Sequence, residues 1–189
     1  MTKLYLVRHG KTSLNESHHI QGWSDAPLTE NGIKEAKHAH DILKEKEIKI
    51  GISSTLGRAI ETLHLVLDEI EIEEHYDGLK EIYFGEYDGQ YETEELLKVT
   101  TNPIGFKKYG GEDHDEALAR FKNCLEEICH KYPNEEIVVV SHGHVLCDFL
   151  KDLEPSLKES KLYPWELVEN GSVMTVSYDT DFHLIERPH

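Results

Sequence analysis

The chain has 189 residues, enough for one domain that buries about 70% of the surface of its unfolded chain. Hydrophobic residues make up 38% and charged residues 30%, as in soluble globular proteins, and the formal net charge is −17. A field of that sign repels nucleic acid and anionic membranes, so the composition argues against both as partners.

Two further features of the composition bear on location. No apolar run approaches the roughly 18 residues of a membrane span, and the first run ends too early for a signal peptide. The three cysteines fit no metal motif and cannot all pair internally. Together these features favour a reducing, cytoplasmic location.

The first third of the chain alternates short apolar runs with helical patterns. Residues 4–7 predict a short buried strand, and residues 50–54 predict a second one. Residues 28–46 carry apolar side chains at helical spacing and predict a helix with Thr29 as its N-cap. Residues 57–70 show the same spacing and predict a second helix.

The rest of the chain is less regular at first. Residues 75–89 are ambiguous between strand and loop. Residues 113–132 predict a third helix, and the β-branched run 136–140 predicts the clearest strand, followed by a fourth helix. The runs 171–178 and 182–186 predict an antiparallel hairpin at a sheet edge.

Strands that alternate with helices of this length predict an α/β fold, a three-layer α/β/α sandwich with a mostly parallel central sheet. We expect residues 1–189 to form a single domain. Residues 86–112 lack a clear period and are interpreted as a small cap-like excursion over the active site. In such sheets, ligands bind beyond the carboxyl ends of the strands.

The most reactive side chains fall at those strand ends. Arg8 and His9 follow the first strand, Arg58 comes just after the second, and His142 follows the run 136–140. A guanidinium group matches phosphate oxygens and keeps its charge, and a neutral imidazole is a competent nucleophile. Phosphoryl transfer needs little beyond such positioning and charge, so the set predicts a phosphate site.

One histidine after a strand is more often structural than catalytic. Two such strand ends, carrying two of only four arginines in the chain, favour the functional interpretation. Gly10 and Gly143 are expected to bring backbone N–H groups to the same phosphate oxygens.

Five motifs carry a resemblance to a known family, in the right order between about residues 3 and 150. They are LYLVRHGKTSLN, IQGWSDAPLTENG, ISSTLGRAIET, LKEIYFGEYDG and VVVSHGHVL. Through them the chain resembles the histidine phosphatase superfamily, the phosphoglycerate-mutase-like proteins, in their phosphatase branch.

The resemblance implies a role for each matched position. His9 is the expected nucleophile, while Arg8, Arg58 and His142 are expected to bind phosphate and stabilise the transition state. Glu81 is the expected general acid and later the base, which predicts that burial raises its pKa toward the working pH. The resemblance implies that four further residues complete the phosphate pocket: Asn15, Gln21, Gly22 and Gly143.

Several positions depart from the family's usual motifs. Lys11 stands where glutamate is usual, and Gly57 where a larger residue is common. His144 replaces a residue that is often small, and Cys147 one that is often arginine. These departures leave the substrate preference open. Thr12 has two expected roles, a contact to phosphate or a helix cap.

The function predicted is hydrolysis of a small phosphorylated metabolite through a phosphohistidine intermediate, with no metal and no cofactor. Two alternatives stay open: a phosphoglycerate-mutase-type phosphotransferase, and a weakly active phosphate-binding regulatory module. A mutase handles a substrate with additional negative charge, whereas the excursion has few cations. They are Lys98, Lys107 and Lys108.

Metal binding by the histidine-rich stretches is a further alternative. His38 and His40 would face apart on a helix, and His18 and His19 sit in a loop without a nearby cysteine. The sequence therefore favours a site without metal. It leaves monomer and homodimer equally open.

Overall fold

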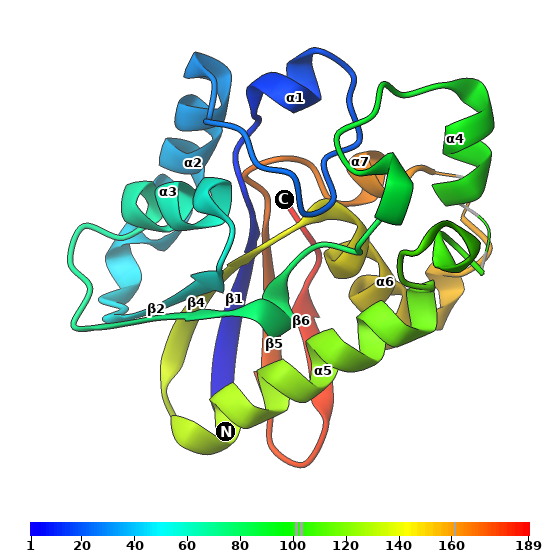
Figure 1. Cartoon of the computed structure of the whole chain (residues 1–189). Coiled ribbons are helices and arrows are strands. Elements are labelled where there is room, and N and C mark those ends of the chain that lie inside the picture. Colours follow the sequence, from blue (N-terminus) through cyan, green and yellow to red (C-terminus); the bar gives the residue numbers. More distant parts are fainter. Residues whose placement is uncertain (101, 103, 161) are drawn as a thin grey trace.

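A computed structural model describes residues 1–100, 102, 104–160 and 162–189. Its described strands form one six-stranded sheet in the order β3-β2-β4-β1-β5-β6 (Figure 1). The strands are β1 (Thr2–Arg8), β2 (Ile50–Ser54), β3 (Ile72–Tyr76), β4 (Glu136–Ser141), β5 (Val173–Tyr178) and β6 (Phe182–Glu186).

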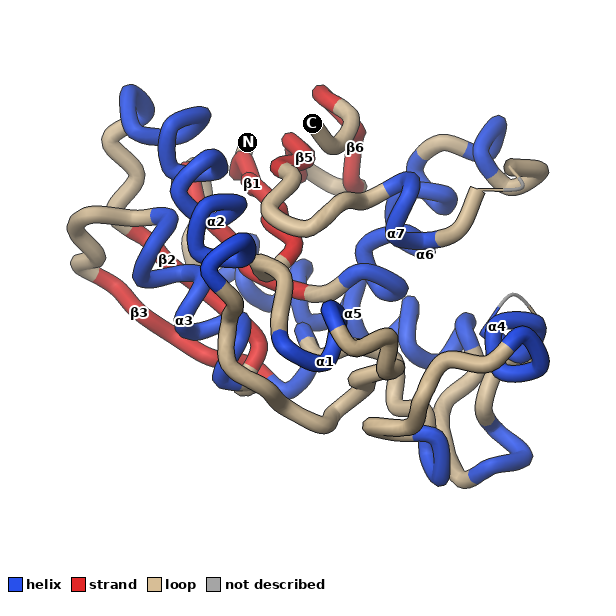
Figure 2. The backbone as a smooth tube through the Cα atoms, turned by 90° about the horizontal axis from the view of Figure 1, so that it is seen from above, coloured by secondary structure: helices blue, strands red, loops and turns tan. Residues whose placement is uncertain are grey.

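Helices connect these strands. They are α1 (Ser13–Glu16), α2 (Glu30–Leu43), α3 (Gly57–Val66), α4 (Glu94–Thr100), α5 (His114–Lys131), α6 (Gly143–Leu153) and α7 (Pro164–Leu167). Seen from above in Figure 2, α2 and α3 lie to one side and α5 and α6 to the other. None of the helices in the described part of the chain is long and apolar enough to cross a membrane.

Side chains of the central strands alternate between two apolar cores. Leu4 and Leu6 of β1 belong to the core beneath α5 and α6, whereas Tyr5 and Val7 belong to the core beneath α2 and α3. This alternation is the period of a strand buried on both faces. The predicted three-layer sandwich is therefore confirmed.

The sheet is mixed, with a parallel centre. β1 pairs in parallel with β4, β4 with β2, and β2 with β3, while β5 runs antiparallel to β1 and β6 antiparallel to β5. The predicted terminal hairpin is thus confirmed. In the β1–β4 register Arg8 lies opposite Ser141, so the residues after them, His9 and His142, leave the sheet at the same edge.

Local signals set most helix ends. Thr29 caps α2, since its side chain accepts a hydrogen bond from the Gly32 amide at 3.2 Å. The predicted helix 57–70 ends earlier, at Val66, because Leu67 is extended and leads the chain toward β3. β3 was not predicted from the sequence, and only its last two residues fall within the ambiguous stretch 75–89. It is a largely exposed edge strand with two adjacent glutamates, so it lacks the apolar pattern of a buried strand.

Leu96 and Phe106 of the excursion belong to a small third core, which they share with apolar residues outside it. The excursion's described residues include α4, and Figures 1 and 2 show this helix standing away from the sheet on the side of α5 and α6. Positions 101 and 103 of the predicted excursion lie outside the described residues. Phe106 is 1% exposed and packs on Phe84 with ring centroids 4.5 Å apart. Phe106 therefore packs the excursion together and does not line an open pocket.

One histidine ties the excursion to the core. The His114 ring lies 2.6 Å from an Asp148 carboxylate oxygen through Nδ1 and 3.0 Å from the Thr100 carbonyl through Nε2. Neither acceptor has a proton to give, so the imidazolium form satisfies both. Burial lowers the pKa of His114, but Asp148 and the Thr100 carbonyl outweigh burial and raise it above the usual value.

We predict that His114→Gln destabilises the fold more at low pH than at high pH. Because the folded-state pKa is raised, the contacts stabilise fully below the unfolded pKa of about 6.5 and weaken as pH rises through the folded pKa. Urea unfolding should show a loss of about 1–3 kcal/mol at acidic pH and a smaller loss at alkaline pH. Equal losses at both would contradict the imidazolium assignment.

Candidate active site

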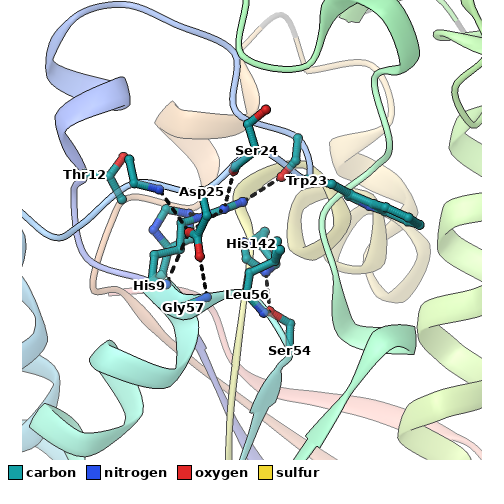
Figure 3. A network of polar contacts seen from close by, with 12 residues as sticks. His9, Thr12, Trp23, Ser24, Asp25, Ser54, Leu56, Gly57 and His142 are labelled. Carbon is teal, nitrogen blue, oxygen red and sulfur yellow. Dashed lines mark hydrogen bonds and ion pairs between the residues drawn. The ribbon is translucent and has the colours of Figure 1, made fainter.

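The two histidines at the strand ends lie side by side. The rings of His9 and His142 have centroids 5.1 Å apart and planes inclined by 55° (Figure 3). The His9 amide donates to the Ser141 carbonyl at 3.0 Å, which extends the β1–β4 pairing to the histidine itself. His9 is 3% exposed and His142 is fully buried.

The hydrogen bonds of His9 select one tautomer. Nδ1 lies 2.8 Å from the Gly10 carbonyl, which can only accept, so Nδ1 carries the proton. Nε2 then has a free lone pair, and the Nε–H of Arg58 donates to it at 3.3 Å. The atom with the lone pair is therefore the one that faces the positive charge.

His142 has the same tautomer but is held through its other nitrogen. The Ser54 hydroxyl accepts from the Leu56 amide at 3.3 Å, so its own proton is free to go to Nε2 of His142, 2.7 Å away (Figure 3). Nδ1 then carries the ring proton. Nδ1 is buried and has no hydrogen-bond partner among the described residues. This Nδ1–H is therefore a buried donor without an acceptor among those residues.

Arg58 is held in place on its far side. Its Nη1 donates to the Ser24 carbonyl at 2.8 Å and to Asp25 at 3.2 Å, and its Nη2 donates to the Gly22 carbonyl at 2.8 Å. Together with the hydrogen bond from Nε to His9, these contacts orient the plane of the guanidinium group. The loop that contains Gly22 therefore positions the predicted arginine.

Asp25 is a site residue that the sequence analysis missed. Its carboxylate accepts from the amides of Gly57 and Arg58 at the start of α3 (Figure 3). A Cβ at position 57 would lie 2.7 Å from an Asp25 oxygen, so the glycine that departs from the family motif makes room for this contact. A turn residue in a loop gave no signal for such a role.

Arg8 and Gly143 meet closely. Arg8 Nη1 donates to the Val168 carbonyl at 2.7 Å, and its Nε is buried without a partner in the described part of the chain. A Cβ on Gly143 would lie 2.9 Å from the Arg8 guanidinium carbon. Position 143 therefore needs a glycine so that the guanidinium can lie across the start of α6.

Positive charge sets the protonation of both rings. Burial, together with the charges of Arg58 and Arg8, holds the pKa of His9 well below its usual range. Burial and the charge of Arg58 do the same to the pKa of His142. Both imidazoles are therefore neutral near pH 7, as a nucleophilic histidine must be.

Gly10 does not serve the role that we expected. Its amide donates to the Thr62 hydroxyl at 3.1 Å, so the prediction that this N–H faces phosphate is wrong. The glycine is needed for packing instead, because a Cβ there would lie 2.3 Å from the Gly32 carbonyl oxygen at the start of α2.

The loop after Gly10 is fixed by a local cap. Thr12 and Asn15 form a capping box at α1, with the Asn15 amide donating to the Thr12 hydroxyl at 3.2 Å. Of the two expected roles of Thr12, the helix cap is thus the one observed. Gln21, another predicted pocket residue, is buried, and its side-chain oxygen Oε1 has no partner among the described residues.

A cavity of about 680 Å³ adjoins this arrangement. It is bordered by Arg8 and Asn15, two of the predicted phosphate ligands, and by Lys11 from the same loop. The two histidine rings and Arg58 are not part of its lining. Its remaining lining is His18, Lys34, Glu35, His38, Glu92, Trp165, Glu169, Asn170, Gly171, Ser172 and His189.

Glu81 lies against the start of α6. Its carboxylate accepts from the amides of Ile82, His144 and Val145, each at 3.0 Å. Burial raises the pKa of Glu81, but contact with the His144 ring and amide outweighs burial and holds the pKa well below its usual range. The expectation that burial raises this pKa is therefore wrong in the resting site, since the amides favour the ionised form.

Arg120, which the sequence analysis counted but gave no role, fixes the Glu81 loop. Its guanidinium donates to the carbonyls of Gly78, Lys80 and Glu81 at 2.9–3.1 Å. The Glu112 carboxylate accepts hydrogen bonds from Nε and Nη2 of the same guanidinium, each at 2.8 Å. The scarcity of arginine was the only sequence signal for it.

Asn170 is a second missed residue. Its side-chain amide donates to the His9 carbonyl at 2.9 Å.

The histidine-rich stretches are occupied by local contacts. His19 Nδ1 lies 2.9 Å from the Ser17 hydroxyl, and His40 Nδ1 lies 3.1 Å from the Val66 carbonyl. In the described residues, no group of three or more His, Cys, Asp or Glu side chains is placed to hold a metal ion.

Comparison with known proteins agrees with this geometry. The family model of the histidine phosphatase superfamily (branch 1) matches residues 4–188. The chain is 30% identical to a 2,3-bisphosphoglycerate-dependent phosphoglycerate mutase of Bacteroides fragilis, over 82% of this chain and 78% of that one. It is 32% identical to a metal-independent phosphoserine phosphatase of Arabidopsis thaliana, over 77% of this chain and 66% of that one. The solved structure of Bacillus stearothermophilus YhfR matches with TM-score 0.85 and 28% identity, and the match covers 98% of this chain and 96% of that one.

We predict that the His9 and His142 rings of the free protein stay neutral as the pH falls through about 6.5, where an ordinary exposed histidine titrates. The cause is burial beside two guanidinium groups. Ring ¹⁵N chemical shifts measure this directly. Protonation of either ring near pH 6.5 would contradict it, and Arg58→Met should raise the pKa of His9.

We also predict that Gly143→Ala folds but loses activity, because its methyl group displaces the Arg8 guanidinium. A misplacement of this size should cost about 10- to 100-fold in kcat/KM. The measurement is turnover of an aryl phosphate, with circular dichroism as the check on folding. A folded variant with full activity would show that Arg8 need not lie across α6.

Proposed function

On the premise that the chain belongs to the histidine phosphatase superfamily, we propose that it is a metal-independent phosphomonoester phosphatase that forms a phosphohistidine on His9. The observation that carries this proposal is the state of that ring. Nδ1 is committed to the Gly10 carbonyl, so the free lone pair lies on Nε2, beside the guanidinium of Arg58. A neutral nucleophile next to fixed positive charge suits attack on an anionic phosphoryl group.

In the first half-reaction the phosphoryl oxygens accept hydrogen bonds from Nε–H of Arg8 and from Nδ1–H of His142, two buried donors that have no partner in the described residues. Nε2 of His9 attacks phosphorus, and the bond to the leaving oxygen breaks. The N–P bond uses the lone pair that Arg58 now contacts, so the Arg58 Nε–H turns to a phosphoryl oxygen. The leaving oxygen takes a proton from Glu81.

In the second half-reaction water attacks the phosphohistidine. The ionised Glu81 removes a proton from that water as the O–P bond forms and the N–P bond breaks. His9 regains its lone pair and phosphate leaves. Glu81 must therefore be protonated once per cycle, and a bound phosphate dianion nearby favours that state.

Hydrolysis is favoured over mutase chemistry by the cations of the excursion. Lys107 forms ion pairs with Asp113 and Glu116, and Lys108 lies over the Tyr109 ring at 4.7 Å. These ammonium groups are already engaged, which leaves them unsuited to a second anionic group of a substrate. The similarity to a phosphoglycerate mutase makes the phosphotransferase the second candidate.

The proposed substrate is a small phosphorylated metabolite. The cavity of about 680 Å³ beside Arg8 and Asn15 is of the size that holds a small molecule. With a net charge of −17, nucleic acid and anionic membranes are poor partners for this surface. We propose a cytoplasmic monomer or homodimer.

The test is turnover and trapping. The protein should hydrolyse p-nitrophenyl phosphate in the presence of EDTA, and rapid acid-free quenching with ³²P-labelled substrate should trap an acid-labile, base-stable phosphoprotein. His9→Ala should lose at least about 10³-fold in kcat and all labelling, because the step through nitrogen is lost. His183→Ala, an exposed change on β6, is the control and should keep both.

Two other outcomes would overturn this proposal. Incubation with 3-phosphoglycerate and 2,3-bisphosphoglycerate that gives fast phosphoryl transfer between phosphoglycerates with little free phosphate would favour the mutase. No turnover of any phosphomonoester, with phosphate bound, would favour a regulatory binding module.

A further inference from the structure

The general acid of the proposed reaction has an unusual environment. Glu81 must hold a proton before it can give one to the leaving oxygen. Yet its two carboxylate oxygens accept three backbone N–H groups, two of them from the start of α6. Such donors stabilise the carboxylate over the carboxylic acid. A second group that stores the proton would resolve this conflict.

His144 is placed to be that group. Its Nδ1 lies 3.5 Å from Oε2 of Glu81, and both side chains are largely buried, 13% and 8% exposed. The ring also packs edge-on against Phe84, with centroids 5.2 Å apart. The position is one at which the chain departs from the motif of its relatives, and the proposed reaction gives it no role.

The surroundings decide which nitrogen carries the proton. Nε2 of His144 is buried and has no partner within the described residues. A proton there would be an unpaired buried donor, and a lone pair on Nδ1 would face a carboxylate oxygen. The tautomer with Nδ1–H avoids both costs and directs its proton at Glu81.

We propose that Glu81 and His144 share one transferable proton, so that the pair, and not Glu81 alone, is the acid that protonates the leaving oxygen. His144 is then a positioning and proton-storing residue that never touches the substrate. This inference rests on the proposed function.

The protons balance over one cycle. Before substrate binds, the active form of the pair carries one proton more than the resting Nδ1–H ring. His144 is then an imidazolium, and the ionised Glu81 beside it offsets the cost of the unpaired Nε2–H. The Nδ1 proton moves to Oε2 and from there to the leaving oxygen as its bond to phosphorus breaks. In hydrolysis Glu81 takes one proton from the attacking water and returns it to Nδ1. No external acid or base is consumed.

Other charged groups also face this pair. Arg8 of β1 and Arg58 of α3 both interact electrostatically with Glu81 and favour its ionised form. From the strand end beside it comes His142, and from α6 itself comes Asp148, one turn beyond His144. Asp148 is already bound to His114, which reduces its effect on the pair. From the excursion side the ring meets Phe84, which carries no charge. Glu81 is the only carboxylate in ion-pair contact with His144 among the described residues.

The experiment compares leaving groups. An alkyl phosphate needs a proton on its leaving oxygen, whereas p-nitrophenolate leaves without one. His144→Asn keeps an N–H toward Glu81 but cannot store a second proton, and His144→Ala removes both. We expect both variants to lose about 10- to 100-fold in kcat/KM for the alkyl phosphate and less than about 3-fold for p-nitrophenyl phosphate.

The pH profile gives a second readout. With the alkyl phosphate, the rate should fall at high pH as the pair loses its proton. In His144→Asn this limb should move to lower pH, since Glu81 alone then holds the proton against three amide donors. A variant that only disturbed folding would lower kcat/KM for both substrates by the same factor, and the fall in rate at high pH would stay where it is in the wild-type protein. His64→Gln, which breaks a surface His–Glu pair at 2.7 Å, is the matched control and should change nothing.

Two results would overturn the inference. One is a His144→Asn variant with the wild-type ratio of the two substrates and an unmoved limb. The other is restoration of full alkyl phosphate activity by Asn but not by Ala, which would reduce His144 to a hydrogen-bond donor. Failure of the proposed function looks different, because the wild-type protein would then hydrolyse neither substrate and form no phosphohistidine.

Discussion

The parallel pairing of β1 with β4 is the constraint on which the site depends. It sets Arg8 opposite Ser141, so that two chain segments more than a hundred residues apart leave the sheet together and deliver His9 and His142 to one place. Everything else at the site adjusts to that meeting point. The Gly22 loop and Asp25 aim Arg58 at it, and the start of α6 holds Glu81 beside it.

Much of this arrangement could be predicted from the sequence because its signals are local. The β-branched run before Ser141 and the apolar run before Arg8 show two buried strands, and Thr29 shows where a helix begins. Since parallel strands end at one sheet edge, the side chains after them had to meet there. The fold class and the meeting of Arg8, His9 and His142 at one sheet edge follow from those few signals.

The rest could not be predicted because it depends on contacts between distant segments. Asp25, Ser54 and Asn170 are ordinary polar residues of loops or strand ends, and only the folded chain brings them to Arg58, His142 and His9. The edge strand β3 lacks the apolar pattern of a buried strand. The ionised state of Glu81 depends on amides of a helix that begins 62 residues later.

The buried positive charge of the site has a consequence for how such a protein evolves. Arg8 and Arg58 are 8% and 1% exposed, so folding removes both guanidinium groups from water, at a cost that their hydrogen bonds offset only in part. The apolar cores on both faces of the sheet must offset the rest. Replacing either arginine with a well-packed neutral residue should therefore make the protein more stable but inactive. Selection for activity, and not for stability, keeps these charges in place.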